Sequence, residues 1–276
     1  MKKIIIIILA ITIVAYFLGY RFNSNEYKLE NTPTIFAHRG IRNYSVENSA
    51  ESFILADKLG FKAIELDISV TKDQFPIIFH DDNCKRLIGI DTLIEEVNID
   101  FFKDRYLLYK GQKTKNKVLL LSSFVKNIQK DKTIYFDIKT PSKQLADSFI
   151  YLLNKYNKYE TSIIADDNIF FLGYLKYKNP KIRTVLEGYN KGKELLYYLI
   201  PHKYRPDFYS SYFSEVDTDH ISFLKENNLM QNKIVYGIDK HNLDTLISTG
   251  IKNIILDFDS SMINNQQIIN KLNNTK

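Results

Sequence analysis

Short runs of β-branched and other apolar residues alternate with longer helical patterns along most of this chain. Such alternation predicts parallel strands joined by helices. The strand patterns number about eight, the count that closes a (β/α)8 barrel of roughly 250 residues. We therefore predict an α/β fold with a TIM barrel over residues 32–276. The predicted barrel strands are 34–37, 62–70, 133–138, 162–165, 183–186, 208–211, 233–238 and 253–256.

Helical patterns separate these strands, and one connection, around residue 100, also contains a long irregular stretch. A helix is predicted to open after Ser49, and a short extra strand over 75–79 follows the second barrel strand. Residues 83–117 then lack a regular period and exceed an ordinary connection, so they predict an insertion over one barrel face. The remaining predicted helices are 122–129, 142–156, 169–177, 191–199, 217–227, 242–248 and one after residue 260.

The composition fits a globular enzyme or binding domain. The 276 residues are 45% hydrophobic and 25% charged, which excludes a disordered chain. The net charge of +6 is spread over the sequence without clusters of Lys and Arg, so we expect no nucleic-acid partner. The single cysteine, Cys84, excludes an intrachain disulfide.

The N-terminal segment predicts a membrane anchor. Residues 1–3 are basic, and residues 4–20 form an uncharged apolar run at the short limit for crossing a bilayer. The run lacks a small-residue cleavage site, which favours an uncleaved anchor over a cleaved signal. Residues 21–31 are polar and predict a linker. Lys2 and Lys3 favour an inside N-terminus and an exported domain, which would be secreted if the segment were cleaved.

Two carboxylates share one face of the second predicted barrel strand. Residues 63–68 alternate apolar and acidic side chains, so Glu65 and Asp67 point the same way. Two acids at this spacing can chelate a hard cation such as Mg²⁺ or Ca²⁺. Asp137 ends the third barrel strand, where it supplies a third carboxylate. We predict a divalent-cation site made by these three side chains.

Basic and imidazole groups also stand at strand ends. His38 and Arg39 end the first strand, His80 ends the extra strand, and Lys139 shares a face with Asp137. The carboxyl ends of parallel strands meet at one mouth of a barrel, so these residues can form one site. Two histidines can divide proton removal and proton donation between them, and Arg39 and Lys139 can bind an anion.

The order of these motifs resembles the glycerophosphodiester phosphodiesterase family. The match covers residues 35–139, and residues 246–257 are similar to the closing helix and strand of the family. The chain has Asp137 where the family usually has Glu, and residues 235–239 replace its late aromatic-rich strand. The matching motifs are His38-Arg39-Gly40, Glu47-Asn48, Glu65 with Asp67, Thr71 with Asp73, His80-Asp81, and Asp137 with Lys139.

The resemblance implies metal-dependent hydrolysis of glycerophosphodiesters to glycerol 3-phosphate and an alcohol. It implies His38 and His80 as the acid–base pair, Arg39 and Lys139 as phosphate ligands, and Glu65, Asp67 and Asp137 as ligands of one Ca²⁺ or Mg²⁺. Glu47, Asn48 and Asp81 would support the site. The alternatives are a lysophospholipase D of the same barrel and an inactive ligand-binding barrel. The sequence leaves open the leaving alcohol, the oligomeric state, and which histidine is the base.

Overall fold

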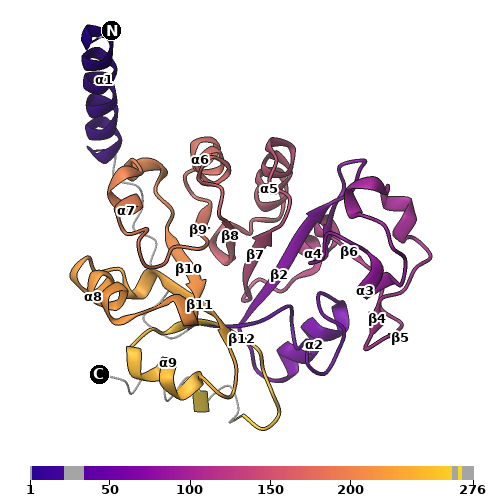
Figure 1. The fold of residues 1–276 in the computed structure, drawn as a ribbon. Coiled ribbons are helices and arrows are strands. Elements are labelled where there is room, and N and C mark those ends of the chain that lie inside the picture. Colours follow the sequence, from indigo (N-terminus) through magenta and orange to yellow (C-terminus); the bar gives the residue numbers. More distant parts are fainter. Residues whose placement is uncertain (1, 22–33, 263–266, 269–276) are drawn as a thin grey trace.

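The computed structural model describes residues 2–21, 34–262 and 267–268 (Figure 1). Its centre is a closed barrel of parallel strands, in which β1 pairs with both β2 and β12 and so joins the two ends of the sheet. This confirms the predicted TIM barrel. Around the barrel the strands are β1 (Ile35–Ala37), β2 (Ala63–Val70), β7 (Thr133–Ile138), β8 (Ser162–Asp166), β9 (Arg183–Leu186), β10 (Phe208–Tyr212), β11 (Lys233–Ile238) and β12 (Asn253–Leu256).

Helices on the outside of the barrel connect these strands. The predicted helix over 191–199 is shorter in the structure, because Gly192 has a positive φ of 83° and the chain turns there before the helix begins at Leu195. The helices that follow the barrel strands are α2 (Ala50–Lys58), α4 (Leu121–Asn127), α5 (Lys143–Tyr156), α6 (Ile169–Lys178), α7 (Leu195–Leu199), α8 (Thr218–Glu226) and α9 (Leu243–Thr249).

The barrel is filled by side chains and is not a pore. Alternate residues of each strand point inward, and one buried cluster draws on all eight barrel strands, including Phe36, Tyr135 and Phe208. The intervening residues, such as Ile64 and Phe136, join a larger cluster beneath the helices. The inward positions nearest the carboxyl ends of the strands carry the polar groups of the mouth.

One side of the barrel carries an antiparallel extension. The end of β2 pairs with β3 (Pro76–Ile78), which pairs with β6 (Leu119–Leu120). Between β3 and β6, residues 83–117 form short elements rather than the irregular loop that the sequence suggested: α3 (Lys85–Ile88) and the hairpin of β4 (Leu108–Tyr109) and β5 (Gln112–Lys113). Buried side chains including Phe79, Leu87 and Phe102 hold this segment on the barrel.

The N-terminal helix α1 (Lys2–Arg21) projects away from the barrel (Figure 1). Among the described residues, no helix combines the length and apolar character needed to cross a membrane. The predicted transmembrane anchor over residues 4–20 is therefore not supported. Nearly all of the predicted linker, the predicted domain start at residue 32, and most of the predicted last helix lie outside the described residues.

Candidate active site

The mouth of the barrel gathers the predicted site residues because of strand register. Asp67 on β2 stands directly opposite Asp137 on β7, and neighbouring strands lie about 4.8 Å apart. Glu65 lies two residues before Asp67 and shares its inward direction. His38 directly follows β1, whose last residue pairs with Ile64 of β2. Residues from distant parts of the sequence therefore meet at one end of the barrel.

Three carboxylates form a compact acidic cluster there. Glu65, Asp67 and Asp137 each offer an oxygen, and these oxygens lie within 4.8 Å of one another. Glu65 and Asp67 are buried, with relative exposures of 2% and 0%. Burial, together with the charges of Asp67 and Asp137, raises the pKa of Glu65. Burial also raises the pKa of Asp137, and the nearby carboxyls of Glu187 and Asp67 add to the effect.

Two cations border the acidic cluster. Nζ of Lys139 lies 2.6 Å from Oδ2 of Asp137 and 3.1 Å from Oδ1 of Asp67. Nε of Arg39 lies 3.1 Å from Oδ2 of Asp67. Burial opposes ionisation of Asp67, but Arg39 and Lys139 outweigh it and lower the pKa of this carboxyl. The centre of the cluster is thus a carboxylate held ionised between two cations.

A tight turn after β1 positions the first of these cations. Arg39 and Asn48 have positive φ angles of 52° and 55°, and the backbone N–H of Arg39 donates to Oε2 of Glu65 at 2.8 Å. The side-chain amide of Asn48 donates to Oδ2 of Asp67 at 2.7 Å. Gly40, with φ of 77°, has no room for a side chain, because an added Cβ would stand 2.4 Å from Oγ of Ser52.

His38 is backed by a carboxylate from the far end of the chain. Its Nδ1 lies 2.7 Å from Oδ1 of Asp257, the residue directly after β12, while its Nε2 lies 3.9 Å from Oε2 of Glu65. Asp257 also accepts a hydrogen bond from Arg42 at 2.8 Å. Burial lowers the pKa of His38, although the contact with Asp257 acts in the opposite direction. A neutral imidazole that donates through Nδ1 presents its Nε2 lone pair to the mouth.

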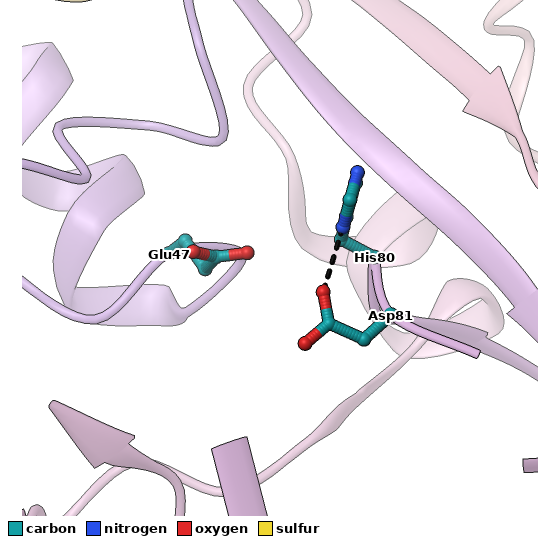
Figure 2. Close-up of side chains that lie close together, drawn as sticks. All are labelled: Glu47, His80 and Asp81. Atoms are coloured by element: carbon teal, nitrogen blue, oxygen red, sulfur yellow. Dashed lines mark hydrogen bonds and ion pairs between the residues drawn. The ribbon is translucent and has the colours of Figure 1, made fainter. Parts of the chain in front are cut away.

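His80 has a carboxylate partner of its own. Its Nδ1 lies 2.7 Å from Oδ1 of Asp81, and Figure 2 shows Glu47, from the segment after β1, lying beside this pair. Ligand atoms of Glu47, His80 and Asp81 lie within 4.8 Å of one another. Arg86 donates to both carboxylates, with two bonds of 2.8 Å to Glu47 and bonds of 2.7 and 2.8 Å to Asp81. A guanidinium thus occupies the place that a metal would need.

Three residues of this mouth are not among those predicted from the sequence. Asp257 and Arg86 back the histidines as described above. Glu187 follows β9 and accepts a hydrogen bond of 2.6 Å from the hydroxyl of the buried Tyr135. The alternation of β9 could have identified Glu187, because Val185 points into the barrel. No local pattern in the sequence indicates that Arg86 pairs with Glu47 and Asp81, or that Asp257 pairs with His38.

Comparison with known proteins now defines the family. The family model for the glycerophosphoryl diester phosphodiesterase family matches residues 38–259, which is most of the chain. The chain belongs to this family. A glycerophosphodiester phosphodiesterase of Caldanaerobacter subterraneus subsp. tengcongensis is 23% identical over 237 residues, covering 83% of this chain and 96% of that protein. A lysophospholipase D of Homo sapiens is 26% identical over 142 residues, covering 48% of this chain and 44% of that protein.

A solved structure supports the same fold. The Oleispira antarctica phosphodiesterase in complex with the product sn-glycerol-3-phosphate has a TM-score of 0.72 and 21% identity, covering 87% of this chain and 97% of that chain. This likeness concerns the fold of the family barrel. Every site residue predicted from the sequence lies in the mouth or in the layer directly behind it.

Proposed function

We propose that this protein hydrolyses glycerophosphodiesters to glycerol 3-phosphate and an alcohol. The observation that carries the proposal is the meeting, at one barrel mouth, of three carboxylates, two cations and two histidines that each have a carboxylate partner. The activities for which the Caldanaerobacter and Oleispira proteins are named support it. A phosphodiester is an anion whose cleavage needs charge stabilisation and two proton transfers, and this set of groups can supply both.

Glu65, Asp67 and Asp137 fit one divalent cation. Their donor set is entirely oxygen, which suits Mg²⁺ or Ca²⁺. Burial and neighbouring carboxylates raise the pKa values of Glu65 and Asp137, and a cation would favour the ionised form of both groups. When bound, the ion would stabilise negative charge on the phosphoryl oxygens. Arg39 and Lys139, which pair with Asp67 in its absence, would then be available to the phosphate.

The two histidines divide the proton transfers. His38, whose pKa is lowered by burial, suits the base: Nε2 takes the proton of the attacking hydroxyl as its oxygen bonds to phosphorus. His80 suits the acid: as the bond from phosphorus to the leaving oxygen breaks, the imidazolium protonates that oxygen. As in the family, the glycerol hydroxyl can be the first nucleophile, which gives a cyclic phosphate that water then opens. Asp257 and Asp81 orient the two rings.

A lysophospholipid is the second candidate substrate, since the human relative is named a lysophospholipase D. A cavity of about 350 Å³ beside Lys139 offers space for a group attached to the phosphate. Its lining is mixed, with Val70, Leu93 and Ile94 next to Asp82 and Glu95. A mixed cavity of this size suits a small polar alcohol better than a long acyl chain, so we favour glycerophosphodiesters.

We also propose that α1 attaches the domain to a lipid surface, with the catalytic domain exported. The supporting observation is a row of apolar side chains, from Ile4 to Leu9, with relative exposures of 57–64%. Apolar surface of this extent on a helix favours burial in lipid or in another protein. The proposal of export rests on the basic Lys2 and Lys3 ahead of this apolar row, and cleavage of the segment would instead give a secreted enzyme.

The test uses several glycerophosphodiesters and the variants His38→Ala and His80→Ala. Wild-type protein should release glycerol 3-phosphate, and each variant should turn over about 10²- to 10⁴-fold more slowly. A nitrophenyl phosphodiester does not need its leaving oxygen protonated, so it should rescue His80→Ala and not His38→Ala. No turnover by wild type would indicate the inactive barrel. Equal rescue of both variants would contradict the acid–base division.

A further inference from the structure

The ion pairs of the mouth form one continuous chain that leads from the acidic cluster to His80. Arg39 contacts Asp67 at 3.1 Å and donates to Glu47 at 3.0 Å. Glu47 accepts from Arg86. Arg86 in turn donates to Asp81, whose Oδ1 lies 2.7 Å from Nδ1 of His80. Positive and negative groups alternate along the whole chain.

Arg86 is the link between the two halves of this chain. It comes from α3, in the segment 83–117, whereas Glu47 comes from the segment after β1 and Asp81 from the end of β3. Its planar guanidinium makes two bonds to each carboxylate. A lysine, with a single nitrogen on a flexible stem, cannot reproduce that fork.

We propose that Arg86 is a positioning residue, which holds Glu47 and Asp81, and through them Arg39 and His80, in the geometry for phosphodiester hydrolysis. The proposal rests on the function proposed above. Ligand atoms of Glu47 and of the His80–Asp81 pair lie within 4.8 Å of one another. Figure 2 shows the three side chains, and without Arg86 the two carboxylates would face each other there. Glu47 would then compete with the substrate phosphate for Arg39, and Asp81 would lose the group that fixes its orientation.

Arg86 contributes to function more than to folding. Its side chain is 49% exposed, so solvent weakens the contribution of its ion pairs to stability, even though Glu47 is only 10% exposed. The neighbouring Leu87 and Ile88 are buried and hold α3 on the barrel without it. Replacing Arg86 by Gln should therefore leave a folded protein in which the contacts of Glu47 and Asp81 have changed.

The charges around Asp81 predict a change in pH dependence. Burial opposes ionisation of Asp81, but hydrogen bonds from Arg86 and His80 outweigh it and lower its pKa. Glu47 also faces this carboxyl, with ligand atoms of the two residues within 4.8 Å, and the shared guanidinium lowers the pKa of Glu47 as well. Loss of Arg86 should raise the pKa of Asp81, so the pH at which His80 loses its ionised partner should move upward.

The experiment compares Arg86→Gln, Arg86→Lys and the control Lys85→Gln in the full chain. The substrate is sn-glycero-3-phosphocholine with saturating Mg²⁺ or Ca²⁺. Lys85 is the adjacent residue of α3 and pairs with Asp91 on the exposed surface. Arg86→Gln should lower kcat about tenfold or more, raise KM severalfold and raise the pKa of Asp81, which NMR can follow. Lys85→Gln should match wild type, and Arg86→Lys should remain close to Arg86→Gln.

Two further variants test separately the contact of Arg86 with Asp81 and its contact with Glu47. Asp81→Asn should lower kcat with little change in KM, and Glu47→Gln should raise KM with little change in kcat. Wild-type kcat and KM for folded Arg86→Gln, or full activity of Arg86→Lys, would overturn the positioning role while leaving the proposed function intact. If wild type is inactive, the proposed function fails. An unchanged pKa of Asp81 in Arg86→Gln, followed by NMR, would then separately overturn the role of Arg86.

Discussion

At the scale of single residues, the mouth contains buried charged groups, and the pKa of each depends on the charges of its neighbours. Asp67 is fully buried, yet its pKa is lowered, because Arg39 and Lys139 both contact it. Glu65 and Asp137 lack equivalent compensation, and their pKa values are raised by burial and by neighbouring carboxylates. The cluster therefore combines one firmly ionised carboxylate with two that hold protons more readily.

This difference predicts proton-linked metal binding. A bound cation requires deprotonated carboxylates, so binding at Glu65 and Asp137 should release protons and tighten as pH rises. Affinity should rise up to about tenfold per pH unit for each proton released. Calorimetry at about pH 5.5 and about pH 7.5, in buffers with different ionisation enthalpies, measures both quantities.

Two variants support this measurement. Glu65→Gln removes a charged oxygen at nearly constant volume and should weaken both metal binding and metal-stimulated turnover. Asp91→Asn, at an exposed ion pair with Lys85, is the matched control and should bind like wild type. Equal wild-type affinity at both pH values, or full activity in excess chelator, would contradict the assigned cation site.

At the scale of elements, the turn after β1 and the start of α2 form one unit that fixes Arg39. Ser49 accepts from the backbone N–H of Ser52 at 3.1 Å, and the backbone N–H of Ser49 donates to Oγ of Ser52 at 3.2 Å. Such a reciprocal cap defines where a helix begins. The hydroxyl of Ser52 also lies 3.1 Å from the carbonyl oxygen of Arg39. The start of α2 thus contacts the backbone of a phosphate-binding candidate directly.

The contact explains why residue 40 is glycine and predicts the effect of replacing it. Gly40→Ala places a methyl group 2.4 Å from Oγ of Ser52 at a positive φ, and should cost about 2 kcal/mol or more of unfolding free energy. Gly60→Ala, at φ of 84° with no atom within 4 Å, should cost only about 1 kcal/mol. Urea unfolding measures both. Equal costs would show that Ser52 moves aside freely.

At the scale of the whole molecule, closure of the barrel depends on the short first strand, β1. β1 has only three residues, yet it pairs with β12 along its length and with β2 at its end. It thereby covers two strand edges that would otherwise be free. His38 and Arg39 directly follow the same strand, so the strand that closes the barrel also positions two residues of the site. The helix α1 contributes no strand to the barrel.

A fragment of residues 32–276 should therefore fold and keep the activity of the full chain. Every barrel strand lies within it. A fragment of residues 63–276 lacks β1 and should aggregate, because the edges of β2 and β12 are exposed. Gel filtration and circular dichroism compare the two. The full chain should also sediment with lipid vesicles while the 32–276 fragment stays in solution; equal sedimentation would contradict lipid attachment through α1.

Local pattern was enough to predict much of this protein. A period of two placed Glu65 with Asp67 and Asp137 with Lys139 on common faces, because successive side chains of a strand point to opposite sides. Alternation of strands and helices predicted the closed barrel, which the structure confirms. The predicted helix over 191–199 is too long, because its apolar spacing does not reveal the turn at Gly192.

The tertiary structure alone decided which partner each predicted residue has. Asp257 meets His38 across 219 positions of sequence, and Arg86 meets Glu47 across 39, and neither pairing leaves a periodic trace. A sequence pattern records which face of an element a side chain occupies. The tertiary fold brings together the ends of β12, β1 and β3 and the start of α3, and so decides which charges meet. The reason is that ion pairing depends on distance in space, over a few ångströms, and not on distance along the chain.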